Sequence, residues 1–148
     1  REYVTKHFDQ FSWSFEAKLA RLEYITPHFL AKEVLKLKSH FDWVVDIGCG
    51  TGWVGQNFRN NVEIIEGVDL SQNMLKLSRE KDVYDHLELD DYNDFLLKRE
   101  NSVDLVTAAD VLVYVGDLAK TFSSASKALV KGGLFAASFE LLNEYECL

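Results

Sequence analysis

From residue 43 onward, continuous runs of hydrophobic residues alternate with segments in which hydrophobic positions recur every three or four residues. The continuous runs predict buried strands, and the segments with helical spacing predict helices. Apolar strands that alternate with helices favour a mostly parallel sheet covered on both faces. The expected strands are 43–47, 62–68, 84–89, 103–108 and 134–139, and the expected helices are 53–59, 71–80, 93–98 and 117–130.

Capping and turn residues mark several boundaries. Ser71 stands at an N-cap position, and residues 131–133, Lys-Gly-Gly, are typical of a helix stop followed by a turn. Thr26-Pro27 is typical of an N-cap with proline at the first helical position, and it predicts a helix that ends near Ser39.

Residues 1–40 are rich in aromatic and charged residues, and their spacing predicts two short amphipathic helices before residue 26. The aromatic side chains between residues 8 and 24 suit an ordinary core as well as a lid over a site. We expect one domain over residues 1–148, in which 1–40 form an N-terminal helical lid and 41–148 an α/β core that is truncated at its C-terminus.

In a Rossmann-like sheet of this kind, ligands bind at the carboxyl ends of the strands, near the point at which strand order reverses. Gly48, Gly50 and Gly52 follow the first strand and precede a helix. Glycine allows a tight turn and a close approach of the backbone to a ligand, and the N–H groups at the helix start favour an electron-rich partner. Asp69 ends the second strand.

Two cofactor classes fit these glycines. Gly50, Gly52 and Gly55 satisfy the GxGxxG pattern of dinucleotide sites, and Asp69 follows Gly50 by 19 residues, near the spacing of a ribose-binding acid. Asp46 favours the other class. A carboxylate at this strand end repels a pyrophosphate, whereas it attracts the ammonium and sulfonium groups of S-adenosylmethionine. Alternatively, Asp46 only caps the loop by binding backbone N–H groups.

The other strand ends supply further candidates for an adenosine site. The Asp69 carboxylate suits the two ribose hydroxyls, and it also suits the start of the helix after Ser71. At residues 90–92, Asp-Asp-Tyr, an acid could accept from the adenine amino group and the tyrosine ring could lie on the adenine face; the alternative is an ordinary acidic loop.

Charge and cysteine content narrow the partners. The net charge of −8 disfavours nucleic acid held by bulk charge, because phosphate binding needs a basic face. No apolar run approaches the roughly 20 residues of a membrane span. Cys49 and Cys147 are far apart and have no histidine spacing around them, so we expect neither a disulfide nor a metal site. A cytoplasmic location without membrane contact is expected, and the oligomeric state stays open.

Five motifs, given below in chain order, resemble the ordered motifs of class I S-adenosylmethionine-dependent methyltransferases. They cover about residues 43–140. Phrases at 8–11, 22–24 and 109–114 resemble a bacterial subgroup of predicted methyltransferases, some of which carry tetratricopeptide repeats. The motifs are Val-Val-Asp-Ile-Gly-Cys-Gly-Thr-Gly (44–52), Gly-Val-Asp-Leu-Ser (67–71), Leu-Asp-Asp-Tyr (89–92), Asp-Leu-Val-Thr-Ala-Ala-Asp-Val-Leu-Val-Tyr-Val-Gly-Asp-Leu (104–118) and Lys-Gly-Gly-Leu-Phe (131–135).

The resemblance implies a seven-stranded sheet, so two C-terminal strands are missing from this sequence, which we expect to be a segment of something longer. It implies that the first motif contacts the methionine portion, Asp69 the ribose and Asp91 the adenine, and that N-terminal helices with Phe11, Trp13 and Tyr24 form a lid. The expected cofactor-binding residues are Asp46, Gly48, Cys49, Gly50, Gly52, Asp69, Leu70, Asp90, Asp91, Tyr92 and Ala108.

We therefore expect a methyltransferase that acts on a small-molecule or protein acceptor. The candidate bases are Asp110, Tyr114 and His28, with Asp110 preferred because it follows the fourth strand; it also suits a helix start or a contact to the cofactor's ammonium group. Cys49, between two glycines, is expected to fill a small space rather than act as a nucleophile. The alternatives are an oxidoreductase with a nicotinamide cofactor, and a cofactor-binding or adaptor module without catalysis.

Overall fold

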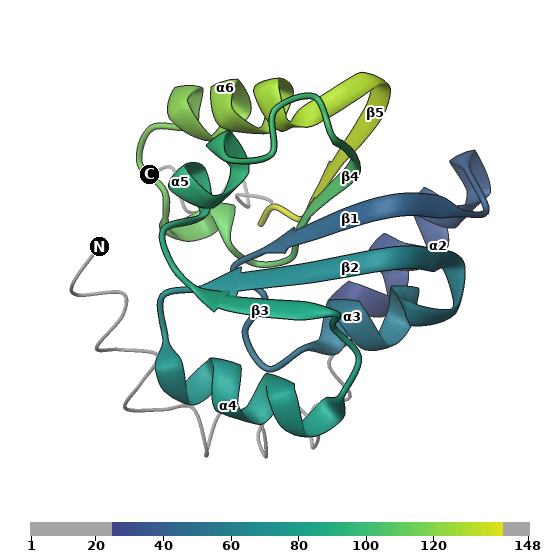
Figure 1. Ribbon diagram of the computed structural model, residues 1–148, viewed down its shortest axis with the longest axis vertical. Coiled ribbons are helices and arrows are strands. Elements are labelled where there is room, and N and C mark those ends of the chain that lie inside the picture. Colours follow the sequence, from purple (N-terminus) through teal and green to yellow (C-terminus); the bar gives the residue numbers. More distant parts are fainter. Residues whose placement is uncertain (1–24, 141–148) are drawn as a thin grey trace, which may run out of the picture.

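The computed structural model describes residues 25–140 of the 148-residue chain. The predicted helices before residue 26, the lid candidates Phe11, Trp13 and Tyr24, and Cys147 lie outside the described residues. The elements are α2 (Thr26–Leu37), β1 (Phe41–Ile47), α3 (Trp53–Phe58), the 3₁₀ turn η1 (Arg59–Asn61), β2 (Val62–Asp69), α4 (Gln72–Lys81), β3 (His86–Leu89), α5 (Tyr92–Leu97), β4 (Val103–Ala108), the 3₁₀ turn η2 (Leu112–Tyr114), α6 (Ala119–Ala128) and β5 (Leu129–Ala137) (Figure 1).

The described strands form one parallel sheet in the order β3-β2-β1-β4-β5 (Figure 1). The chain runs outward from β1 to β3 and then returns to the other side of β1 at β4. The strand order therefore reverses between β1 and β4, which is where ligands of such sheets bind. The parallel α/β fold predicted from the sequence is confirmed.

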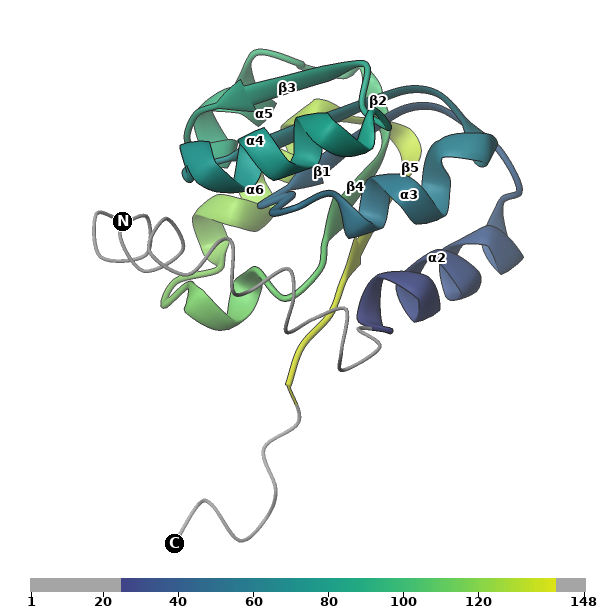
Figure 2. The ribbon, with the colours of Figure 1, turned by 90° about the horizontal axis from the view of Figure 1, so that it is seen from below.

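Helices cover both faces of the sheet. α2, α3 and α4 lie on one face, and α5 and α6 lie on the other (Figures 1 and 2). Each face buries its own apolar cluster: one centres on Phe41, Phe58 and Ile65, and the other on Ile47 and Phe95. β4 is buried along its whole length, as its continuous apolar run requires. None of the helices within residues 25–140 combines the length and apolar character that a membrane span needs.

Several predicted boundaries hold and several move. β4 has both predicted ends, and Ser71 caps α4 by accepting a hydrogen bond from the Met74 N–H at 3.2 Å. The predicted cap at Thr26 is wrong by one residue, because α2 already includes Thr26 and the N-cap is Ile25. β1 starts earlier than predicted, at Phe41, whose side chain is fully buried.

The two C-terminal elements differ most from the prediction. α6 ends at Ala128, before the predicted end at 130, and β5 starts at once. The predicted turn at 131–133 lies inside β5 as an irregularity: Val103 pairs with Leu129, but Leu105 pairs with Leu134. Gly132 adopts φ +82°, a left-handed conformation that glycine allows, so the strand resumes its pairing after the detour.

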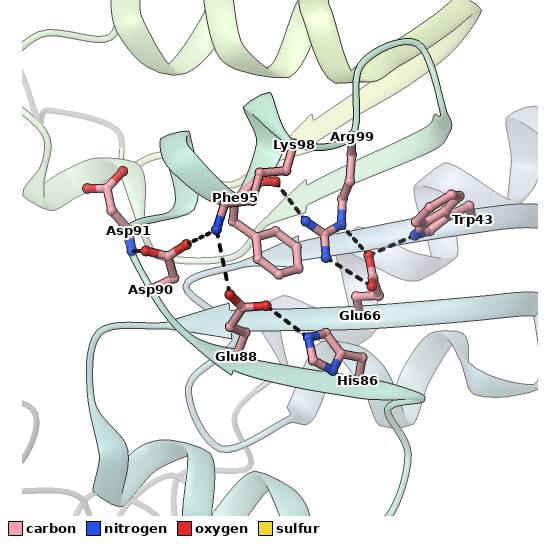
Figure 3. A network of polar contacts seen from close by, with 9 residues as sticks. All are labelled: Trp43, Glu66, His86, Glu88, Asp90, Asp91, Phe95, Lys98 and Arg99. Atoms are coloured by element: carbon pink, nitrogen blue, oxygen red, sulfur yellow. Dashed lines mark hydrogen bonds and ion pairs between the residues drawn. The ribbon is translucent and has the colours of Figure 1, made fainter.

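A buried ion pair ties α5 to the sheet (Figure 3). The Arg99 guanidinium donates to the two Glu66 carboxylate oxygens at 2.6 and 3.1 Å, and the Trp43 indole N–H donates to the same carboxylate at 2.8 Å. The Glu66 and Arg99 side chains are only 10% and 12% exposed. Arg99 also lies over the Phe95 ring and donates to the Phe95 carbonyl at 2.8 Å. Loss of Arg99 would leave Glu66 buried with one neutral donor.

We expect Arg99→Gln to lower the free energy of unfolding by about 3 kcal/mol, because it leaves a buried carboxylate without its counter-charge. Urea unfolding measures this change. The control is Lys36→Gln, which breaks an ion pair with Glu33 whose side chains are 60% and 66% exposed, and which should leave the unfolding midpoint unchanged. Equal midpoints for wild type and Arg99→Gln would contradict the prediction.

Candidate functional site

The loop between β1 and α3 has three glycines in left-handed conformations. Gly48, Gly50 and Gly52 have φ values of +60°, +54° and +95°. A Cβ at Gly48 would lie 2.5 Å from a Val111 methyl carbon, and one at Gly52 would lie 2.9 Å from the Ser78 hydroxyl, so these two glycines are required by packing. A Cβ at Gly50 would meet nothing within 4 Å. Of the three, Gly50 is the one that presents its backbone to open space.

Asp69, at the end of β2, holds this loop in place. Its Oδ2 accepts a hydrogen bond from the Gly50 N–H at 2.9 Å, and its Oδ1 accepts from the Ser71 N–H at 2.8 Å. One carboxylate thus connects the glycine loop to the start of α4. The residue is partly exposed. The helix-start role expected for Asp69 is present in this geometry, and its predicted contact with ribose stays a prediction.

Asp46 lies beneath the loop rather than in it. The residue is 1% exposed, and its carboxylate accepts from the Tyr84 hydroxyl at 2.5 Å and from the Thr107 hydroxyl at 2.9 Å. Both partners are side chains, so the alternative that Asp46 caps the loop through backbone N–H groups does not describe the structure. Burial raises the pKa of Asp46 to about 7, although the two hydroxyls stabilise its charged form; the nearby Asp69 charge raises it further.

Cys49 fills space between the loop and β2. The residue is 7% exposed, and a Cβ placed at Gly67 would lie 2.9 Å from the Cys49 sulfur. Burial, together with the charges of Asp69 and Asp46, raises the pKa of its thiol, which keeps the sulfur protonated and unreactive. Leu70, the neighbour of Asp69, is partly exposed.

The segment after β3 brings Asp90 beside Asp69. The Asp90 N–H donates to the Asp69 carbonyl at 3.2 Å, so the ends of β2 and β3 meet. The Asp90 carboxylate accepts from the Asp91 N–H at 2.8 Å and pairs with Lys98 at 3.3 Å (Figure 3). Asp90 is thus part of the same sheet edge as the glycine loop.

The side chains of Asp91 and Tyr92, at the start of α5, both make hydrogen bonds within the protein. Asp91 is the N-cap of α5, and its Oδ1 accepts from the Asn93 and Asp94 N–H groups at 2.9 and 3.2 Å. The Tyr92 hydroxyl is 2.7 Å from the Thr121 hydroxyl of α6, which ties the ring to that helix. Their predicted contacts with adenine stay predictions, and each side chain has a structural role besides.

Asp110 follows β4 in a left-handed conformation, with φ +55°. Its N–H donates to the Ser138 hydroxyl at 2.7 Å, and that hydroxyl donates to the Asp110 carboxylate at 3.0 Å. The Ser138 N–H donates to the carbonyl of Ala108, whose side chain is fully buried. The left-handed backbone conformation is costly for a residue other than glycine, and residues held in it are common at functional sites.

The two other candidate bases differ in setting. Partial burial raises the pKa of Tyr114, and the charges of Asp110 and Glu140 add to the rise, so at neutral pH its hydroxyl is protonated. His28 is exposed on α2, beside Phe29. Within residues 25–140, no three His, Cys, Asp or Glu side chains are grouped closely enough to hold a metal ion.

Two residues that contact Asp46 were not predicted. Thr107 lies opposite Asp46 in the register of β1 and β4, so knowledge of that pairing would have identified it. Tyr84 was predicted to be part of the third strand, but that strand begins at His86 and Tyr84 belongs to the connection before it. Nothing local in the sequence distinguishes this tyrosine from one inside a strand.

Comparison with known proteins places this geometry in a family. A family model described as a methyltransferase domain matches residues 45–137. Ubiquinone biosynthesis O-methyltransferase of Hydrogenovibrio crunogenus is 27% identical over 94 residues, which are 61% of this chain and 39% of that protein.

Solved structures of methyltransferases also resemble this chain. An S-adenosylmethionine-dependent methyltransferase from Clostridium acetobutylicum is 27% identical, with a TM-score of 0.68, over 88% of this chain and 56% of the other. One from Mesorhizobium loti is 30% identical, with a TM-score of 0.62, over 72% of this chain and 49% of the other. This chain spans less than two thirds of each relative. Because the family model covers more than half of it, the chain belongs to the class I S-adenosylmethionine-dependent methyltransferases.

Proposed function

We propose that the protein containing this chain transfers a methyl group from S-adenosylmethionine to a small-molecule or protein acceptor. The observation that carries this proposal is the open backbone of Gly50, held by the Asp69 carboxylate at the edge where strand order reverses. Family membership supports the same activity, and none of the relatives named above is an oxidoreductase.

The residues at this edge fit S-adenosylmethionine. Asp69 holds the glycine loop and Asp46 lies beneath it, and two carboxylates at this place repel a pyrophosphate and attract a cation. The free space at Gly50 admits a ligand against the backbone. In this proposal the loop 48–52 receives the methionine portion, Asp69 and Leu70 the ribose, and 90–92 the adenine.

When bound, S-adenosylmethionine supplies an electrophilic methyl group on a positively charged sulfur. The contribution of the chain is to bind, orient and exclude water, because alignment of two reactants alone can lower a barrier by roughly 7–11 kcal/mol. In this proposal Asp110, which follows β4, lines the acceptor side, and Ala108 contributes only its backbone because its side chain is fully buried. Asp110 is our candidate to accept a proton from an oxygen or nitrogen nucleophile, since Ser138 fixes one of its oxygens. The lid predicted from the sequence of residues 1–40 stays a prediction.

The activity is tested with radiolabelled S-adenosylmethionine and a mixture of metabolites and proteins from a cell extract. We expect label to appear in a metabolite or a protein. Cofactor binding without label transfer to any fraction would favour a non-catalytic cofactor-binding module.

Binding of the product cofactor tests the role of Asp69. We expect calorimetry to detect S-adenosylhomocysteine and not NAD, and we expect Asp69→Ala to weaken the affinity at least about tenfold, or about 1.4 kcal/mol, through loss of a charge-assisted contact. Glu63→Ala is the matched control, because Glu63 is exposed on the same strand far from the loop. Circular dichroism shows whether each variant is folded.

Asp69→Asn adds a second comparison, because it keeps an oxygen for the Gly50 N–H but removes the charge. It should lose affinity as well. An Asp69→Ala variant with unchanged affinity would remove Asp69 from the site, and binding of NAD alone would favour the nicotinamide alternative.

The burial of Asp46 predicts a pH dependence of stability. Its pKa of about 7 lies above the ordinary value of 3.8, so the folded state holds a proton that the unfolded state releases. The stability that this proton provides is complete below pH 3.8 and is lost as the pH rises through 7. Between pH 5 and pH 8, wild type should lose about 3 kcal/mol of unfolding free energy relative to Asp46→Asn.

Urea unfolding of both proteins at the two pH values measures the difference, and groups common to both cancel. A difference between the two proteins that does not change with pH would show that Asp46 keeps its charge throughout this range.

A further inference from the structure

The Tyr84 hydroxyl joins the two elements on either side of the glycine loop. It donates to the Asp46 carboxylate at 2.5 Å and accepts from the Gly55 N–H at 3.2 Å. Asp46 stands near the end of β1, and Gly55 stands in the first turn of α3. The five residues of the loop, 48–52, are therefore spanned from below by one phenol.

The Tyr84 ring also determines which residues this part of the chain can hold. A Cβ at Gly55 would lie 2.6 Å from the ring, and one at Gly52 would lie 3.3 Å from it. The ring thus occupies the space that side chains at both positions would need. The contact depends on glycine at the end of the loop and on glycine in the first turn of the helix.

The connection that carries Tyr84 is held on both sides by Arg59. The guanidinium donates to the Val83 carbonyl at 3.1 Å and to the Asp85 carboxylate at 2.8 Å. The same Asp85 oxygen accepts from the Ile65 N–H of β2 at 2.7 Å. The backbone before and after Tyr84 is therefore fixed to β2 and η1, and the direction of the phenol is fixed with it.

We propose that Tyr84 is a positioning residue, which acts through Asp46 and Gly55 to keep the glycine loop in the shape that binds the cofactor. This inference rests on the proposed function. Tyr84 does not need to touch the cofactor for this role, because its effect passes through the residues at the two ends of the loop.

The charge of Asp46 gives this role a measurable signature. The groups that face Asp46 are the hydroxyls of Thr107 from β4 and Tyr84 from the connection before β3, the carboxylate of Asp69 from β2 and the thiol of Cys49 from the loop. The two hydroxyls favour the carboxylate, and Asp69 opposes it. Without the Tyr84 hydroxyl, the pKa of Asp46 rises further. As the pH falls, the proposed cation-binding site then loses the negative charge of Asp46 at a higher pH than in wild type.

The test is Tyr84→Phe, which removes the hydroxyl and keeps the ring. At pH 7 we expect S-adenosylhomocysteine to bind about tenfold more weakly than to wild type, as for the loss of one hydrogen bond to a charged group. The pH below which the affinity drops to less than half of its maximum should rise by about one unit. The Asp46 carboxyl carbon, followed by NMR in the unliganded protein, should show the same shift of its titration.

Trp43→Phe is the matched control. It also removes an aromatic donor from a buried carboxylate, that of Glu66, but near the start of β1, away from the loop. It should leave both the affinity and the pH profile unchanged. Arg59→Gln, which keeps the phenol and removes its ties at residues 83 and 85, should weaken binding in the same direction as Tyr84→Phe.

The outcomes separate the two proposals. Wild-type affinity and an unshifted pH profile in Tyr84→Phe would overturn the role of Tyr84 and leave the proposed function standing. Equal losses in Tyr84→Phe and Trp43→Phe, with no shift in either pH profile, would also overturn it, because general loosening would explain both. Failure of wild type to bind S-adenosylhomocysteine would overturn the proposed function and this inference with it.

Discussion

A carboxylate that is fully buried at the end of β1 is the constraint around which this domain is arranged. Water cannot solvate Asp46, so hydroxyls must, and they come from two different parts of the chain. Thr107 belongs to β4, on one side of β1, and Tyr84 belongs to the connection before β3, on the other. To satisfy one acid, the sheet must pair β1 with β4 and the chain must return past α4. The glycine loop lies directly above the point where these segments converge.

The two acids at this edge have different tasks. Electrostatic reasoning from the sequence has Asp46 attract a cation directly, yet its side chain is buried and already has two donors. Any attraction it exerts therefore acts through the loop. Asp69 is the acid at the surface of the loop, and it accepts from Gly50 and Ser71.

The features predicted from the sequence depend on neighbours along the chain. The apolar run 103–108 needs no distant information to be a buried strand, and Ser71 caps a helix through a contact three residues away. The same is true of the glycine loop and of Asp69, whose places follow from the strands they end.

The features that were missed depend on partners far away in sequence. Tyr84 reaches Asp46 across 38 residues, and the Tyr92 hydroxyl reaches Thr121 across 29. Propensity cannot reveal either contact, because it depends only on neighbours along the chain. The local sequence around Gly132 predicts a turn, because only the pairing of β5 with β4 shows that the strand continues beyond this irregularity. Long-range pairing thus decides the details of the site after local pattern has decided its place.

Gly48 and Val111 show how closely two halves of this edge depend on each other. The valine methyl groups fill the space in which a side chain at position 48 would stand. A side chain at residue 48 would therefore need a smaller or displaced residue 111 and would also strain the left-handed backbone (φ +60°); Val111 adjoins Asp110. Position 48 should therefore stay glycine in homologous sequences, and the space that this glycine leaves is filled by the Val111 methyl groups, next to the residue proposed to face the acceptor.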